Sequence, residues 1–298
     1  MNAQTITALR THDDRAPEVV WLGDERASAP ALTGGKAATL SRLATAFNVP
    51  CGFVVAVPGT TLDRSARADV AAAYRRLAEL AGVAEPPVAV RSSAVDEDGV
   101  DASFAGQHDT FLNVSGVDQL WWAIARCVAS FGAGRALAYR RDSGLPEAPE
   151  RVAVLVQWLV PADAAGVVFS ANPVTGARDE VVVNASFGLG ESVVGGTVTP
   201  DTYVLAHAGL AVRERVVADK RRMTIAVPGG TREVPVPGRL GRMPSIDDAQ
   251  ARAAAQLAIA LEREMALPVD LELAWAGPDL FLVQCRPITT LSTNRSTA

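Results

Sequence analysis

Short runs of β-branched residues alternate along this chain with longer stretches in which apolar residues recur every three or four positions. The first pattern predicts buried strands, and the second predicts helices with one apolar face. Ser245, with Asp248 three residues later, predicts the capping box of a long helix that ends at Glu264. Strands are expected at residues 53–57, 88–90, 152–160, 166–169 and 181–183, and further helices at residues 61–82 and 117–139. The alternation indicates a mixed fold of helices and sheets.

Residues 269–287 carry the most distinctive polar pattern of the chain. Before the turn, Asp270, Glu272 and Ala274 alternate with Leu271, Leu273 and Trp275, and Gly277-Pro278-Asp279 can close the three-residue loop of a β-hairpin. Pairing of Ala276 with Leu280 would bring four polar side chains onto one face, with Asp270 opposite Arg286 and Glu272 opposite Gln284.

Such a polar face is costly to form between apolar strands unless something bridges it. Carboxylate and amide oxygens are hard ligands for Mg²⁺, and arginine holds phosphate oxygens, so magnesium with a polyphosphate would bridge the face. The alternative is a cross-strand ion pair between Asp270 and Arg286, with Glu272 on the surface. The pattern alone leaves both interpretations open.

Lysine is rare, because only Lys36 and Lys220 occur among 28 basic residues. The compact ammonium group reaches a single phosphate oxygen that a guanidinium imitates poorly, so a retained lysine is a candidate phosphate ligand. Lys36 follows Gly34-Gly35 and opens an apolar-periodic stretch typical of a helix. Glycines before a helix N-terminus let backbone N–H groups approach an anion. The alternative is a lysine left on a solvated surface by chance.

Composition narrows the class of protein. A chain of 298 residues with 49% apolar and 20% charged residues is expected to fold into two lobes around a full core. The net charge of −5 argues against a nucleic-acid partner. Cys51, Cys127 and Cys285 show no spacing typical of zinc sites or disulfide frameworks, which favours a reducing cytoplasm. Neither a signal pattern nor an uncharged apolar run of about 18 residues is found, so no membrane partner is expected.

Several ordered sequence blocks resemble a known family. The chain is similar to the ATP-grasp nucleotide-binding domain of the phosphoenolpyruvate synthase and pyruvate phosphate dikinase group, which also supplies the ATP-binding half of rifampin phosphotransferase. The resemblance covers residues 20–290 and lies in the blocks LTGGKAATL, VAVRSSAVDEDGVDASFAGQHDTFLNV, VAVLVQWLV, GVVFSANPVTG, FGLGESVVGGTVTPDTYV, DLEL and QCRPIT.

The resemblance implies an α+β protein with the ATP-grasp fold, in which a nucleotide lies between two lobes. The N-terminal lobe is expected at residues 1–155, the C-terminal lobe at residues 156–292 and a polar tail at residues 293–298. The implied cofactors are ATP and Mg²⁺.

The resemblance also implies roles for particular residues, which are mainly those that surround the polyphosphate. Lys36, Arg91 and Arg286 would contact the phosphates and serve catalysis, because phosphoryl transfer depends on positioning and charge neutralisation. Gln157 would lie beside the adenine, where backbone groups of the following residues also read the base edge. The remaining residues are Gly106 and Gln107 in a loop that closes over the phosphates, Glu191 near the nucleotide, Glu272 and Gln284 as magnesium and ribose or phosphate contacts, and Lys220 as either a basic family position or a surface lysine.

The sequence departs from the family pattern at a few of these blocks. Asp270-Leu271-Glu272-Leu273 keeps both acids of the family motif but loses its tryptophan, and Trp158 replaces a basic residue after Gln157. The segment after Arg91-Ser92-Ser93 also differs from the family pattern. These changes bear on adenine packing and on access of the acceptor, while the expected metal ligands are retained.

The phosphoryl acceptor is not evident within the sequence. Relatives carry an acceptor histidine in a separate domain, whereas His12, His108 and His207 stand in no such motif. The resemblance therefore implies transfer of the β-phosphoryl of ATP to a phosphohistidine-domain partner, with release of AMP and phosphate. One alternative is a stand-alone ATP-grasp kinase or ligase that acts directly on a small-molecule metabolite. Another is a nucleotide-responsive binding subunit without chemistry.

Overall fold

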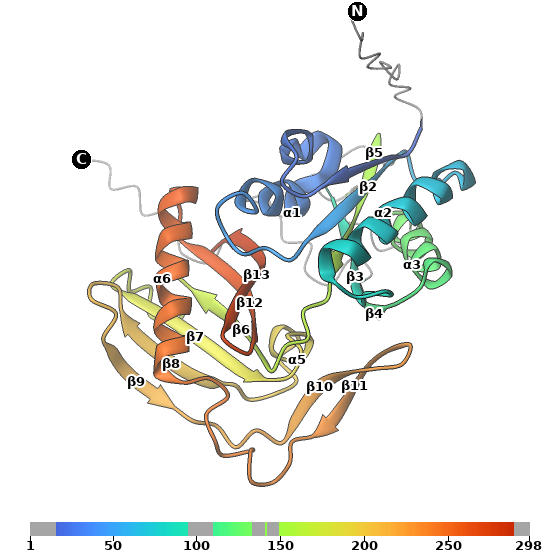
Figure 1. Cartoon of the computed structure of the whole chain (residues 1–298). Helices are drawn as coiled ribbons and strands as arrows, with labels where there is room; N and C mark the ends of the chain where they lie inside the picture. Colours follow the sequence, from blue (N-terminus) through green and yellow to red (C-terminus); the bar gives the residue numbers. More distant parts are fainter. Residues whose placement is uncertain (1–15, 95–109, 133–140, 142–148, 289–298) are drawn as a thin grey trace, which may run out of the picture.

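The computed structural model describes residues 16–94, 110–132, 141 and 149–288, and two antiparallel sheets dominate them (Figure 1). Sheet A has the strand order β1-β2-β5-β3-β4 and forms the N-terminal lobe. Its strands are β1 (Glu18–Trp21), β2 (Gly52–Pro58), β3 (Val88–Ser93), β4 (Thr110–Val114) and β5 (Arg151–Trp158).

Sheet B has the strand order β13-β12-β6-β7-β8-β9 and forms the C-terminal lobe. A separate two-stranded hairpin joins β10 (Arg222–Val227) to β11 (Gly230–Pro235). The strands of sheet B are β6 (Ala164–Phe169), β7 (Glu180–Phe187), β8 (Asp201–Ala206), β9 (Val212–Val216), β12 (Val269–Ala276) and β13 (Asp279–Pro287). Helices and antiparallel sheets therefore combine in an α+β fold, which confirms the predicted fold class.

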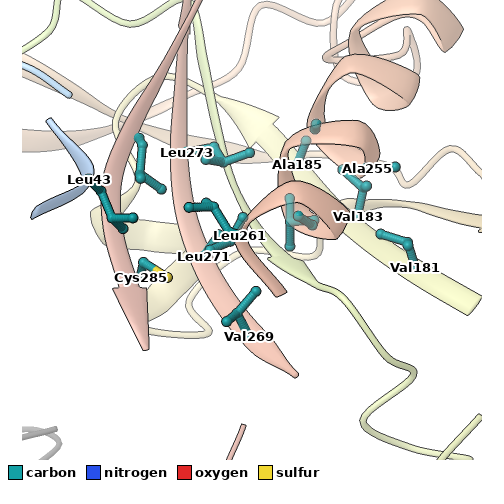
Figure 2. Close-up of a cluster of buried hydrophobic side chains, with 14 of the residues drawn as sticks. Leu43, Val181, Val183, Ala185, Ala255, Leu261, Val269, Leu271, Leu273 and Cys285 are labelled. Atoms are coloured by element: carbon teal, nitrogen blue, oxygen red, sulfur yellow. The ribbon is translucent and has the colours of Figure 1, made fainter. Parts of the chain in front are cut away.

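Helices cover both sheets (Figure 1). On one face of sheet A, α2 (Arg67–Ala81) and α3 (Val117–Ser130) bury a core that includes Phe53, Leu77 and Ile124. On its other face, α1 (Pro30–Leu43) shares a second core with sheet B and α6 (Asp248–Met265). Figure 2 shows this second core, in which side chains of α1, α6 and the strands of sheet B meet. Apolar residues of α1 thus pack with strands of both sheets and join the two lobes.

The predicted helices and strands are found, but several boundaries differ. The helix expected at residues 61–82 begins at Arg67, because Asp63 caps a short 3₁₀ turn before it, and Gly82 ends it in the left-handed region. The helix expected at residues 117–139 is described as α3, while most of residues 133–148 lie outside the described part. The chain crosses between the sheets at residues 159–163, and the division at residue 155 stays a prediction.

The predicted capping box of the last helix is wrong. Asp247 is the N-cap of α6, and its carboxylate accepts from the N–H of Gln250, whose side chain accepts in turn from the N–H of Asp247. Ser245 instead donates through both its N–H and its hydroxyl to Asp201, at 2.7 Å each. Because Ser245 is hydrogen-bonded to the buried carboxylate of Asp201, Asp247 caps the helix instead.

The same carboxylate binds Lys220, which is fully buried rather than a surface lysine. Its Nζ donates to Asp201 at 2.5 Å and to the carbonyl of Ala218 at 3.1 Å, and it lies 5.6 Å from the ring centroid of Phe187. Neither side chain of the pair is exposed to solvent. The pair ties β8 to the segments that enter hairpin β10–β11 and α6, which gives Lys220 a structural role.

We expect Lys220→Met to destabilise the protein by about 3–5 kcal/mol, because removal of one partner leaves a buried charge uncompensated. Urea unfolding followed by circular dichroism measures the loss. Arg222→Met is the matched control, since Arg222 pairs with Glu233 at the surface, and its midpoint should stay close to that of the wild type. Equal midpoints for the two variants would contradict a stabilising role for the buried pair.

Within the described residues, no helix is both long and apolar enough to cross a membrane.

Candidate functional site

Strands β12 and β13 form the hairpin that the sequence predicts, with a correction at its turn. Ala276 pairs with Asp279 rather than with Leu280, so the loop contains only two residues, Gly277 and Pro278. A bulge next to Glu272 then restores the expected alignment. Glu272 consequently lies opposite Gln284, and Asp270 lies opposite Arg286, as predicted.

Alternation along these strands separates an apolar face from a polar face. Leu271, Leu273 and Cys285 enter the core under α6, as Figure 2 shows. The polar side chains therefore project from the opposite face, toward the N-terminal lobe. This face of sheet B is called the site face below, and it carries Asp270, Glu272, Gln284 and Arg286.

An ion pair between the lobes connects the site face to β3. Nη2 of Arg91 donates to Oε2 of Glu272 at 3.0 Å, and the two side chains are only 14% and 18% exposed. Glu272 thus does not lie free on the surface, contrary to the alternative interpretation of the hairpin. Nη1 of Arg91 is buried and has no hydrogen-bond partner among the described residues. Because an unsatisfied buried guanidinium donor is costly, this nitrogen marks a place for a further acceptor.

Asp270 and Arg286 also form an ion pair, as the alternative interpretation expected. Nε of Arg286 donates to the Oδ2 atom of Asp270 at 2.8 Å, and Nη2 of Arg286 lies 2.7 Å from the same oxygen. Burial raises the pKa of Asp270, Arg286 opposes this rise, and the neighbouring charge of Glu272 adds to it. Protonated Asp270 therefore favours the folded state at low pH, and this contribution is lost as the pH rises through the raised folded-state pKa. At neutral pH, a nearby cation would relieve the cost of two adjacent carboxylates.

Lys36 lies on α1 directly beside the end of β3. Gly34 has a left-handed φ of 76° that breaks the helix, and a Cβ there would lie 2.0 Å from the carbonyl oxygen of Ser93. The N–H of Gly35 donates to Ala94 and that of Ala37 donates to the hydroxyl of Ser93. These two N–H groups are therefore engaged by β3 rather than open to an anion, and glycine is required at residue 34 for close approach of the backbones.

The residues on either side of Lys36 contact Ser93 and Ala94, so the backbone of Lys36 lies beside the end of β3, two residues beyond Arg91. Ser93 and Arg91 share one face of the strand, about 7 Å apart. Ser93 is 56 residues from Ala37 in the sequence, so no local pattern predicts that its hydroxyl accepts from this helix. The structure therefore brings the segment of Lys36 together with Arg91, Glu272 and Gln284.

Gln157 lies on the same face of sheet A as Arg91, since it pairs with Ala89 in the neighbouring strand. Its side chain is 1% exposed, and its amide nitrogen donates to the carbonyl of Pro50 at 3.2 Å. The N–H groups of the two following residues, Trp158 and Leu159, donate to other carbonyls of the lobe. A base-edge contact by these residues would have to use their other groups, so the adenine role of Gln157 stays a prediction.

Glu191 begins the short helix α5 (Glu191–Val194), which lies over the site face of sheet B. A Cβ on Gly190 would lie 3.5 Å from the Cβ of Ala165, which pairs with Ala274 on the site face. Oε2 of Glu191 accepts from the hydroxyl of Thr231 in β11, at 2.9 Å. Glu191 is therefore on the expected side of sheet B but is held by hairpin β10–β11.

Two predicted site residues, Gly106 and Gln107, lie outside the described residues, as do His12 and His108. The described part of the chain contains no group of three or more histidine, cysteine or acidic side chains that would hold a metal ion. Mg²⁺ in nucleotide sites is usually bound by one or two protein ligands and by substrate phosphates. Glu272 and Gln284 provide a carboxylate and an amide on paired strands, which fits such a cation.

Comparison with known proteins gives a consistent picture. The family described as "Pyruvate phosphate dikinase, AMP/ATP-binding domain" matches residues 56–298, which include every site residue named above except Lys36. A rifampicin phosphotransferase of Streptomyces sviceus is 43% identical over 203 residues, which are 68% of this chain and 23% of the relative. A probable phosphoenolpyruvate synthase of Methanocaldococcus jannaschii is 38% identical over 220 residues, which are 74% of this chain and 18% of the relative.

A rifampicin phosphotransferase from a Streptomyces species is 37% identical over 92% of this chain and 36% of its own length. The chain thus spans about a fifth to a third of the length of these relatives.

Proposed function

The chain belongs to the pyruvate phosphate dikinase AMP/ATP-binding domain family, and on this premise we propose that it uses ATP with Mg²⁺ to phosphorylate a histidine of a separate partner protein. The β-phosphoryl group goes to the histidine and the γ-phosphoryl group to water, so that AMP and phosphate are released. The observation that supports this function best is the Arg91–Glu272 pair between the lobes. One terminal nitrogen of Arg91 holds a carboxylate suited to a cation, while the other is buried without a hydrogen-bond partner in the described part of the chain. A polyphosphate with its cation would complete both groups.

The proposed roles follow from the positions of the charges. Arg91 would bind phosphate oxygens through Nη1, and Lys36, beside the end of β3, would bind a second set of oxygens. Arg286 would add a third positive charge at the other end of the polar face, where it now neutralises Asp270. These fixed charges orient the polyphosphate and stabilise the charge that develops during transfer, which is most of what phosphoryl transfer requires.

Glu272 and Gln284 would hold Mg²⁺, and Asp270 would contribute negative charge next to them. When bound, the cation neutralises phosphate charge and polarises the phosphorus centre that is attacked. The protein residues fix where this charge lies, because both strands of the hairpin are anchored in the core of the C-terminal lobe.

The acceptor is proposed to lie on another protein because the described histidine is remote from the polar face. Nε2 of His207 lies 3.8 Å from Glu262 of α6, the helix that covers the opposite face of sheet B. A small-molecule acceptor is the second candidate, and the 43% identity to a rifampicin phosphotransferase favours it. The two candidates differ in what the isolated protein does.

The test combines a binding measurement with product analysis. ATP with Mg²⁺ should raise the melting temperature of the isolated protein, since a ligand of the native state stabilises it. Chromatography of nucleotides should then show negligible AMP and ADP, with or without rifampicin. Accumulation of ADP would contradict β-phosphoryl transfer to a partner histidine, and turnover that depends on rifampicin would support the small-molecule alternative.

A further inference from the structure

We propose that hairpin β10–β11 is a clasp between the lobes, in which Asn113 of β4 holds the turn of the hairpin and thereby positions Glu191 for ATP. This inference rests on the proposed function for the role of Glu191. The contacts that form the clasp stand independently of it.

The base of the hairpin is fixed to the C-terminal lobe next to α5. The N–H of Leu189 donates to the carbonyl of Thr224 at 2.8 Å, and Gly188 forms a bridge with the same residue. A Cβ on Gly188 would lie 2.3 Å from that carbonyl oxygen, so a larger residue would push the hairpin away. Because Gly188 also has a φ of 81°, two requirements select glycine there. The base of the hairpin is therefore firmly attached just before Glu191.

The turn of the hairpin is held by the other lobe. Nδ2 of Asn113 donates to the carbonyl of Val227 at 2.6 Å and to that of Gly230 at 2.8 Å. These two residues flank the Pro228-Gly229 turn. One amide group, with its two hydrogens, thus satisfies both carbonyls that the turn presents to β4.

Asn113 adopts an unusual backbone conformation, with a φ of 57°. Few residues other than glycine occupy this region, and asparagine is among those that tolerate it best. Such a conformation persists where surrounding contacts hold it, and the two hydrogen bonds to the hairpin are such contacts. The residue type and the backbone conformation of Asn113 therefore both fit a position that binds the turn of the hairpin.

The clasp connects the two halves of the polar site. Asn113 lies on β4, the neighbour of β3, in which Arg91 binds Glu272. At the other end of the connection, Thr231 directly follows Gly230 and donates its hydroxyl to Glu191. A shift of the turn relative to β4 would therefore move Thr231 and release the carboxylate of Glu191. Asn113 is a positioning residue in this scheme, because it acts through the hairpin.

The test uses Asn113→Asp, which keeps the size and backbone preference of the residue but removes both donors. We expect faster hydrogen exchange of the amides of residues 222–235 and about five- to tenfold weaker ATP·Mg²⁺ binding, as the loss of about one net hydrogen bond implies. Asn48→Asp is the matched control. Asn48 also donates its side-chain amide across the lobes, but to the carbonyl of Leu280 in β13, the edge strand of sheet B, and not to hairpin β10–β11. It should change neither quantity.

A second arm distinguishes positioning from a general loss of structure. In a Glu191→Gln background, Asn113→Asp should weaken ATP binding no further, because the residue through which it acts is already altered. Additive losses in this cycle would overturn the positioning role. Unchanged exchange in Asn113→Asp, with normal ATP binding by the wild type, would overturn the clasp alone. Absence of ATP binding by the wild type would overturn the proposed function and, with it, the role of Glu191.

Discussion

Arg91→Met is expected to weaken ATP·Mg²⁺ binding by about a hundredfold, because truncation of one partner in a largely buried charged contact removes several kcal/mol of binding. The expectation rests on the two nitrogens of the guanidinium group. Nη2 is committed to Glu272, while the buried Nη1 has no partner among the described residues. A phosphate oxygen would supply that partner, and methionine cannot replace the donor.

Arg91→Lys separates charge from geometry. Lysine restores the positive charge but reaches one acceptor at a time, so it should recover only part of the affinity. Isothermal titration calorimetry measures both variants. Arg126→Met is the control, because Arg126 is an exposed arginine of the same lobe that stacks on Trp122 at 5.5 Å. Wild-type affinity in Arg91→Met would show that Arg91 only holds Glu272 in place.

The polar hairpin shows how far the sequence could lead. Alternation over residues 270–275 predicts which side chains of the first strand share a face, since a shift by one residue would expose the apolar set. The pairings of Asp270 and Glu272 are therefore confirmed. The predicted turn is wrong, but the pairings are right because two errors compensate. The loop is one residue shorter than predicted, and a bulge adds that residue back. A bulge of this kind leaves little trace in composition.

Contacts between distant segments were the least predictable feature. The sequence offers a cross-strand ion pair and a magnesium site as alternatives for the hairpin, yet Asp270 pairs with Arg286 while Glu272 pairs with Arg91 of the other lobe. Arg91 is 181 residues away in sequence, and no local pattern encodes that contact. Lys220 is a similar case, because its neighbours in sequence are charged, whereas its own ammonium group is buried against Asp201. At such positions, the pairing partner rather than the local sequence determines where the charged side chain lies.

Glu272→Gln is expected to remove the magnesium dependence of ATP binding, a change of about a hundredfold in the affinity gained on adding Mg²⁺. Without Mg²⁺, the same substitution is not expected to weaken ATP binding. Glu272 now repels phosphate and engages Nη2 of Arg91, so its neutral replacement should leave metal-free ATP binding unchanged or tighter. Loss of the metal effect together with retained metal-free affinity would separate a metal ligand from a residue that merely supports the fold.

The control for Glu272→Gln is a carboxylate of similar burial that lies away from the site face. Glu262 of α6 is 24% exposed and faces His207, on the side of sheet B opposite the polar face, so Glu262→Gln should retain the full magnesium effect. Titrations of ATP with and without Mg²⁺, followed by calorimetry, compare the two variants with the wild type. If Glu272→Gln keeps the wild-type response to Mg²⁺, the cation binds elsewhere, and Arg91 would then be the main partner of Glu272. If metal-free affinity also collapses, Glu272 acts by holding Arg91 in its binding conformation.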